Sequence, residues 1–137
     1  MKKITVEYKK TVSMGIQEDV YETVCSFSNR YGGYIIMGVE DDGTPIGINP
    51  NMVKDMKKNF VNQLNNPDKM SPTLYLSIED IVYEGMTLLW VYVPPTSTVE
   101  KCANRIYDRN EDGDMDITDS PIQLQNMYNR KKQHIMR

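Results

Sequence analysis

The sequence predicts an α+β fold in which about three helices pack on a single mixed, mostly antiparallel sheet. Apolar residues recur at helical spacing in residues 16–31, 53–64 and 122–128, which favours amphipathic helices. Between these segments lie short alternating or continuous apolar runs, bounded by glycine and proline pairs, as is typical of strands. Because helices and neighbouring strand pairs are mixed rather than strictly alternating, the pattern fits α+β better than a parallel sheet with crossover helices.

The composition is that of a globular chain, and it limits the classes of function. Of 137 residues, 39% are apolar and 26% are charged, which predicts one domain over residues 1–137 with one core. No apolar run approaches the ~18–20 residues of a membrane span, and the N-terminus turns polar too early for an export signal. The two cysteines form no framework, so we expect a cytoplasmic protein that does not contact membranes.

The first elements are a strand and a helix. Alternation over residues 4–8 predicts a strand or extended arm, with Glu7 on the face opposite the apolar side chains. Ser13 is the expected N-cap of the following helix, whose apolar stripe continues to Tyr31. The pair Gly32-Gly33 ends this helix, because glycine adopts the left-handed conformation of a helix C-terminus without steric cost.

A hairpin and a second helix come next. Residues 34–39 have the length and composition of a buried strand, and the turn at Asp42-Gly43 predicts a short returning strand over residues 45–48. Asn49-Pro50-Asn51 opens a helix with a periodic apolar face, which stops at Asn65-Asn66-Pro67. Its lysines fall largely outside the apolar stripe.

The last elements are a strand pair, a short edge strand and a helix. Alternation begins at Leu74 and continues to Tyr83, and after the turn at Glu84-Gly85 a second strand runs over residues 86–93. Residues 106–107 suggest a short edge strand. A final helix begins at Pro121, with proline in its first turn and basic residues at its end.

Basic residues form local clusters although the formal net charge is −3. That sign argues against a strongly basic polyanion binder, but contact with phosphates depends on the local field, and a folded chain can present one basic face. Solvated lysines on helix surfaces are the competing explanation for each cluster taken alone. The candidate phosphate contacts are Lys9, Lys10, Arg30, Lys54, Lys57, Lys58 and Arg109.

Several phrases, spread through the chain in order, resemble the Schlafen/AlbA-like DNA-binding domain family. They are Val6-Glu7-Tyr8-Lys9, then residues 24–29 followed by Gly32-Gly33, residues 36–43, Val91 to Pro95, and Ile106-Tyr107-Asp108-Arg109. The resemblance implies a nucleic-acid-binding domain, with DNA favoured over RNA, of the kind found in bacterial transcriptional regulators. It also implies that the chain can be the N-terminal piece of a longer regulator with additional domains.

The same resemblance implies an alternative function, a metal-dependent ribonuclease or related nuclease. Its carboxylates would be Glu7 with Glu40 and Asp41, whose register in the family motif stays open, and its metal would be Mg²⁺ or Mn²⁺. The family's first acid falls at Lys2, so one carboxylate is missing. A hard divalent cation needs several carboxylate oxygens, and an exposed polar turn explains these residues equally well.

Two further alternatives remain at this stage. Residues 108–119 begin like a calcium loop, with Asp108, Asn110 and Asp112 as ligands, but no entering helix precedes them, so an acidic hairpin or loop is favoured over calcium binding. The third functional reading is a protein-interaction module that forms a homo-oligomer. The sequence contains no phosphate-binding glycine loop and implies no definite cofactor.

Overall fold

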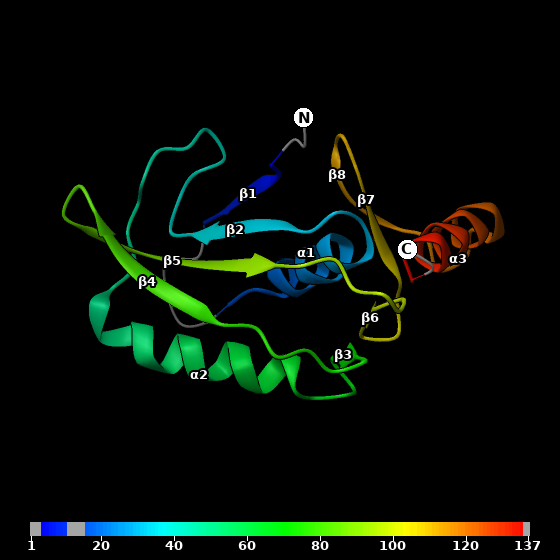
Figure 1. Ribbon diagram of the computed structural model, residues 1–137. Helices are drawn as coiled ribbons and strands as arrows, with labels where there is room; N and C mark the ends of the chain where they lie inside the picture. The colour runs from blue at the N-terminus through cyan, green and yellow to red at the C-terminus, as the bar shows by residue number, and fades with distance from the viewer. Residues whose placement is uncertain (1–3, 11–15, 136–137) are drawn as a thin grey trace.

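The structure is a computed structural model that describes residues 4–10 and 16–135, and it confirms the α+β class (Figure 1). Its main sheet has the strand order β1-β2-β5-β4. The strands are β1 (Val6–Lys9), β2 (Gly33–Met37), β5 (Met86–Val93) and β4 (Ile78–Tyr83). Strand β1 is parallel to β2, whereas the β2–β5 and β5–β4 pairs are antiparallel, so the sheet is mixed as expected.

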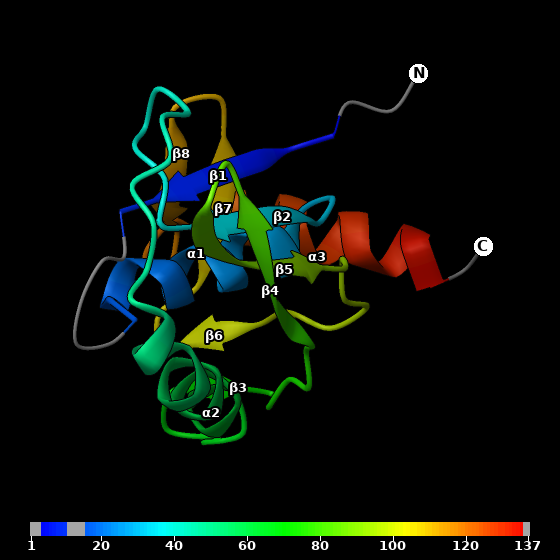
Figure 2. The same ribbon diagram turned by 90° about the vertical axis from the view of Figure 1, so that its left-hand side faces the viewer.

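Helices α1 (Glu18–Asn29) and α2 (Val53–Leu64) pack with the sheet in the main core. From α1, Val20, Val24 and Phe27 are buried, and from α2 the residues Met56, Phe60 and Leu64 are buried, at the helical spacings predicted from the sequence. The ring of Phe60 stacks on Tyr21 with 5.8 Å between centroids, which joins the two helices. A 3₁₀ turn, η1 (Pro50–Met52), leads into α2, and Figure 2 shows α2 end-on with β4 above it.

The first helix is shorter than its sequence pattern suggests. It begins at Glu18 with Gln17 at the N-cap, and the predicted cap Ser13 lies outside the described residues. At the other end Tyr31 has left the helix and is 72% exposed, because the Gly32 amide closes the last turn by donating to the Phe27 carbonyl at 2.8 Å. Gly32 has φ of +78°, and a Cβ there would lie 2.5 Å from the Val93 carbonyl oxygen, so this turn requires glycine.

Two predicted strands are corrected. Residues 45–48 form no strand but only a single bridge, between Val39 and Pro45, because Ile46 and Gly47 both donate to the Gly38 carbonyl. The first strand of the later pair begins at Ile78 rather than Leu74, and residues 74–77 are extended without a sheet partner. The turn at Glu84-Gly85, strand β5 and the stop at Pro94-Pro95 are confirmed.

The described residues form small sheets in addition to the main one. Strands β3 (Met70–Ser71) and β6 (Lys101–Cys102) pair. The segment predicted as a short edge strand and an acidic hairpin or loop is a hairpin of β7 (Tyr107–Asn110) and β8 (Gly113–Asp116). The expected single sheet is therefore supplemented by separate two-stranded units. Cys25 and Cys102 are buried free thiols.

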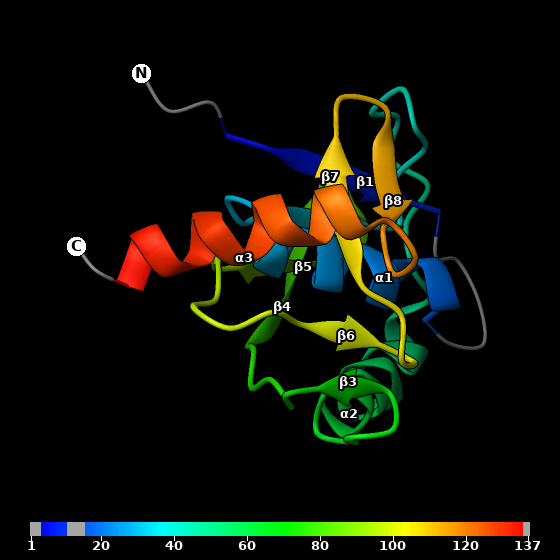
Figure 3. The same ribbon diagram turned by 90° about the vertical axis from the view of Figure 1, so that its right-hand side faces the viewer.

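Helix α3 (Pro121–Ile135) lies beside the β7–β8 hairpin, well apart from α2 (Figure 3). Met127 of α3 packs with Ile106 and Ile117 in a second, smaller core. The buried Lys131 ammonium donates to the carbonyls of Ser28, Thr96 and Thr98 at 3.2, 2.8 and 2.7 Å. This cation therefore satisfies a carbonyl at the end of α1 and fixes α3 against it.

The second face of the main sheet is open and aromatic. Tyr34 of β2 lies against Tyr92 and Trp90 of β5, with ring centroids 5.0 and 6.1 Å apart. Tyr34 and Tyr92 are 36% and 44% exposed. None of the helices in the described part of the chain is long and apolar enough to cross a lipid bilayer.

Candidate nucleic-acid interface

The exposed face of α2 carries three lysines. Lys54 and Lys58 are exposed and one turn apart, and among the described residues neither forms an ion pair. Lys57 lies nearer the sheet and pairs with Asp80 of β4, whose carboxyl pKa is lowered by the hydrogen bond and the charge of Lys57. The apolar stripe turns Met56 and Phe60 inward, and this fixes the lysine side of the helix toward solvent.

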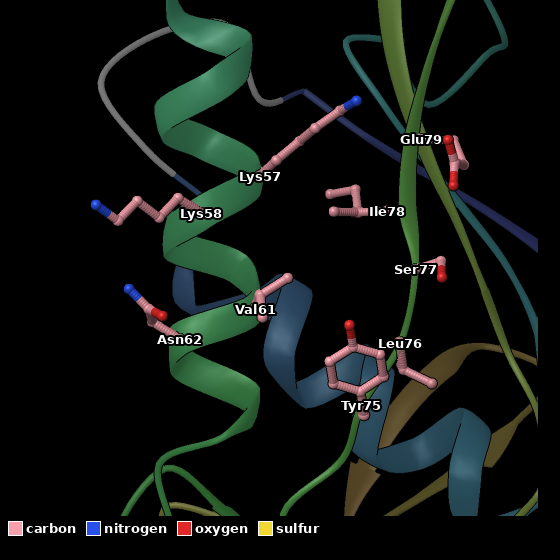
Figure 4. A pocket seen from close by; sticks show the side chains of 9 residues that line it. All are labelled: Lys57, Lys58, Val61, Asn62, Tyr75, Leu76, Ser77, Ile78 and Glu79. Carbon is pink, nitrogen blue, oxygen red and sulfur yellow. The ribbon is translucent and has the colours of Figure 1, made fainter.

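A groove runs between α2 and the chain that enters β4 (Figure 4). Lys57, Lys58, Val61 and Asn62 line it from the helix, and the segment Tyr75 to Glu79 lines it from the other side. Figure 4 shows Lys57 reaching across the gap and Glu79 turned away from the helix. The groove thus has cationic and amide groups along the helix and apolar side chains between the two walls.

Lys9 and Lys10 lie at the end of β1, away from this groove. Lys9 pairs with Asp19 of α1 at 3.1 Å and its side chain is only 12% exposed, so it joins the strand to the helix. Lys10 pairs with Glu40 at 3.0 Å on the surface, and this contact raises the pKa of the Lys10 ammonium. Both cations are therefore already neutralised in the folded chain.

Arg109 is held inside a network that joins β1, α1 and the hairpin. Its guanidinium donates to Glu7 at 2.6 Å and to Asp114 at 2.9 Å, and it lies 5.0 Å from the centroid of the Phe27 ring. Burial lowers the pKa of Arg109, but the hydrogen bonds with the two carboxylates outweigh this and raise it. Asp114 also accepts hydrogen bonds from the Thr23 and Ser26 hydroxyls, each at 2.5 Å.

Arg30 occupies a second network at the end of α1. It pairs with the buried carboxylate of Asp108 at 3.1 Å, and Arg130 of α3 approaches the same carboxylate at 3.4 Å. Arg130 also donates to the Asn29 carbonyl at 2.8 Å, which satisfies a terminal carbonyl of α1. Arg30 and Arg109 thus hold the hairpin against α1, and Arg130 holds α3 there.

The carboxylates of the nuclease alternative lie in separate surroundings. Glu7 is bound by Arg109, Glu40 is bound by Lys10, and Asp41 is exposed at the turn. Within the described residues, no group of three or more His, Cys, Asp and Glu side chains is placed to hold a metal ion. As arranged, with a cation already on two of the three acids, these side chains do not fit a divalent metal centre.

The residues of the calcium-loop alternative belong to the β7–β8 hairpin. Asp108 is directed at Arg30, and the Asn110 carboxamide oxygen accepts from the amides of Asp112 and Gly113 at 2.9 and 3.0 Å. Asn110 therefore closes the turn by satisfying backbone donors. Asp112 is exposed at the tip of the hairpin.

The sequence analysis did not identify some residues of the Arg109 network and of the groove beside α2. The hydrogen bonds of Asp114 with Thr23 and Ser26 join residues that are 91 and 88 positions apart in the sequence. A local spacing pattern cannot predict such contacts. Tyr75 in the groove is 87% exposed, and the local alternation of apolar residues could have predicted this exposure. The alternation that places Leu74 and Leu76 in the core leaves the residue between them outside.

Comparisons with known proteins agree with this architecture. The model of the Schlafen, AlbA_2 family matches residues 2–118. No curated protein sequence matches the chain significantly.

The similar solved structures include the following two. One is the solution structure of the N-terminal domain of a protein from Nitrosomonas europaea related to the ATP-dependent DNA helicase RecG, with 28% identity and a TM-score of 0.52 over 66% of this chain. The other is the crystal structure of the DIP2311 protein from Corynebacterium diphtheriae, with 16% identity and a TM-score of 0.60 over 81% of this chain. The present chain covers 62% of the first and 24% of the second, and the second likeness concerns the fold alone.

Proposed function

Because the chain belongs to the Schlafen, AlbA_2 family, we propose that it is a nucleic-acid-binding domain that binds DNA through the lysine face of α2. The similarity to a domain of a protein related to a DNA helicase supports a ligand of this class. We further propose that the domain serves a bacterial transcriptional regulator, as expected from its sequence motifs.

One observation carries the choice of surface. Lys54 and Lys58 of α2 are exposed beside a groove and have no carboxylate partner among the described residues, whereas Arg30 and Arg109 are partly enclosed and paired with carboxylates. A phosphate can replace water around an exposed lysine at little cost, but it would have to displace the buried carboxylate of Asp108 from Arg30, or the partly buried carboxylates from Arg109. Lys54 and Lys58 are therefore the main proposed phosphate contacts, each acting as a point charge without base readout. Lys57 is proposed as a third contact, for which phosphate would have to replace the carboxylate of Asp80.

The test is a pair of double variants that remove the same amount of charge. Lys54→Gln with Lys58→Gln removes two exposed cations from α2, and Lys101→Gln with Lys132→Gln removes two exposed cations elsewhere. We expect the α2 variant to weaken DNA binding about tenfold at low salt and to flatten the dependence of log K on log salt by about 1 for each lost contact. Fluorescence anisotropy over a salt series measures both quantities, for DNA and for RNA of the same sequence.

The control variant should keep the affinity of the wild type apart from a small effect of net charge. Equal losses in both double variants would mean that only net charge matters, and the α2 surface would be wrong. Absence of binding by the wild type at low salt would remove the proposed function itself.

A further inference from the structure

The groove beside α2 contains an aromatic side chain that is not packed in the core. Tyr75 is 87% exposed, although the residues on both sides of it, Leu74 and Leu76, pack against the main core. The Leu74 amide also donates to the Leu64 carbonyl at 3.0 Å, which ties this segment to the end of α2. The backbone that carries Tyr75 is thus held in place while its ring is presented to solvent.

The helix wall of this groove carries two lysines, of which Lys57 is paired with Asp80, and one carboxamide. Lys57, Lys58 and Asn62 line the same groove from α2, and the floor between the walls includes Val61 and Ile78. Figure 4 shows the Tyr75 ring at one end of the gap and Lys57 reaching into the other end, with Lys58 and Asn62 on the outer side of α2. A phosphate backbone following the lysines would bring its bases toward the aromatic ring.

We propose that this groove binds single-stranded nucleic acid, with one unpaired base stacked on Tyr75 and the neighbouring phosphates on Lys57 and Lys58. The inference rests on the proposed function and specifies its ligand. In a duplex each base is already stacked between its neighbours, so its face is not available to a side chain. An unpaired base exposes that face, and an aromatic ring beside a positive groove is the arrangement that binds single strands without sequence preference.

The aromatic side of the main sheet is a weaker candidate for this role. Tyr34, Trp90 and Tyr92 already contact one another there, and the four strands place one charged side chain on that side, Glu79. Lys9 of β1 points to the opposite side, where it pairs with Asp19. A polyanion would find no cation from these strands on the aromatic side, whereas the groove supplies both the ring and the charge.

The test compares Tyr75→Ala and Tyr75→Phe with the wild type. Anisotropy is measured with one labelled single strand, with the same strand in a duplex, and with the same strand carrying abasic sites. We expect Tyr75→Ala to weaken single-strand binding about 5- to 100-fold, the range of a lost base–aromatic stack, and to leave duplex binding unchanged. Tyr75→Phe should retain single-strand affinity, because the aromatic face is kept.

The abasic strand provides the matched control for the ligand. Wild type and Tyr75→Ala should bind it equally, since it offers no base to stack. Because Tyr75 makes little contact with the rest of the chain, urea unfolding should show the same midpoint for all three proteins. An equal loss for single strand and duplex, or no loss for either, would overturn the stacking inference.

Failure of this inference is distinguishable from failure of the proposed function. If Lys54→Gln with Lys58→Gln abolishes binding but Tyr75→Ala keeps full single-strand affinity, the lysine face stands and the stacking contact is wrong. If the lysine variant keeps full affinity for both ligands, the proposed α2 surface is wrong whatever Tyr75 does, and absence of wild-type binding to either ligand at low salt would overturn the proposed function.

Discussion

The cations of this protein occupy two different surroundings, one at the junction of α1 with the hairpin and one on α2. Arg109 contacts two carboxylates and an aromatic ring at once, and Arg30 shares a buried carboxylate with Arg130. On α2, Lys54 and Lys58 contact no carboxylate among the described residues, and Lys57 contacts one that is half exposed. The first set stabilises the fold because its charges are enclosed, and the second is available to a ligand because its charges are hydrated.

The difference also explains why local sequence reasoning placed all these cations in one class. An arginine in a family phrase and a lysine on a helix surface look alike as candidate phosphate contacts. Their roles separate only when Glu7, Asp108 and Asp114 are found beside the arginines.

The largest expected effect comes from removing the enclosed charge. Arg109→Met keeps the length of the side chain but leaves Glu7 and Asp114 without their cation, so we expect the free energy of unfolding to fall by about 3 kcal/mol. Urea unfolding measures the change. Lys58→Met on the exposed side of α2 is the control and should stay within about 0.5 kcal/mol of the wild type. Equal stability of the two variants would remove the distinction between the regions.

Glu7→Gln is expected to have a smaller effect on the same network. The amide oxygen can still accept from Arg109, and Asp114 keeps its own contact, so we expect a loss of about 1 kcal/mol in the free energy of unfolding. The variant also tests the nuclease alternative, because transfer RNA incubated with the wild type and Mn²⁺ should remain intact. Cleavage by the wild type that disappears in Glu7→Gln would assign Glu7 a catalytic role and contradict the structural one.

Buried charge near α3 predicts a pH dependence of stability. The Glu100 side chain is buried and its Oε2 has no hydrogen-bond partner among the described residues. Burial raises the pKa of Glu100 to about 7, although the charge of Lys131 opposes this shift. The folded chain therefore holds a proton that the unfolded chain has lost, and stability falls as the pH rises from about 4.5 to about 7.

Glu100→Gln removes this titration and should flatten the decline between those pH values. At pH 8 we expect the variant to exceed the wild type in unfolding free energy by on the order of 1 kcal/mol, because no charge is buried at this position. Urea unfolding at a series of pH values gives the comparison. An unchanged slope in the variant would show that another group causes it.

The smallest expected effect separates Lys57 from its neighbours. Its ion pair with Asp80 is largely exposed, so Lys57→Gln should change the free energy of unfolding by less than about 0.5 kcal/mol. If Lys57 also contacts phosphate, the salt slope of DNA binding falls by about 1 in this variant. An unchanged salt slope would mean that Lys57 does not contact phosphate and contributes only to the fold, like Arg30 and Arg109.

The sequence by itself determined the elements whose signals are local. The helical stripe of α2, the turns at Gly32 and Glu84-Gly85, and the proline end of β5 follow from short-range sterics and from which side chains must be buried. The same local phrases are sufficient to indicate the family.

Only the tertiary structure decided which charges are paired. Arg109 and Glu7 are 102 positions apart, and Arg30 and Asp108 are 78 apart, so their contacts depend on how the hairpin packs against α1. The prediction of a returning strand over residues 45–48 is wrong because the amides of Ile46 and Gly47 both donate to the Gly38 carbonyl. Local patterns specify which residues are buried, whereas the partner of a buried charge is set by packing between distant segments.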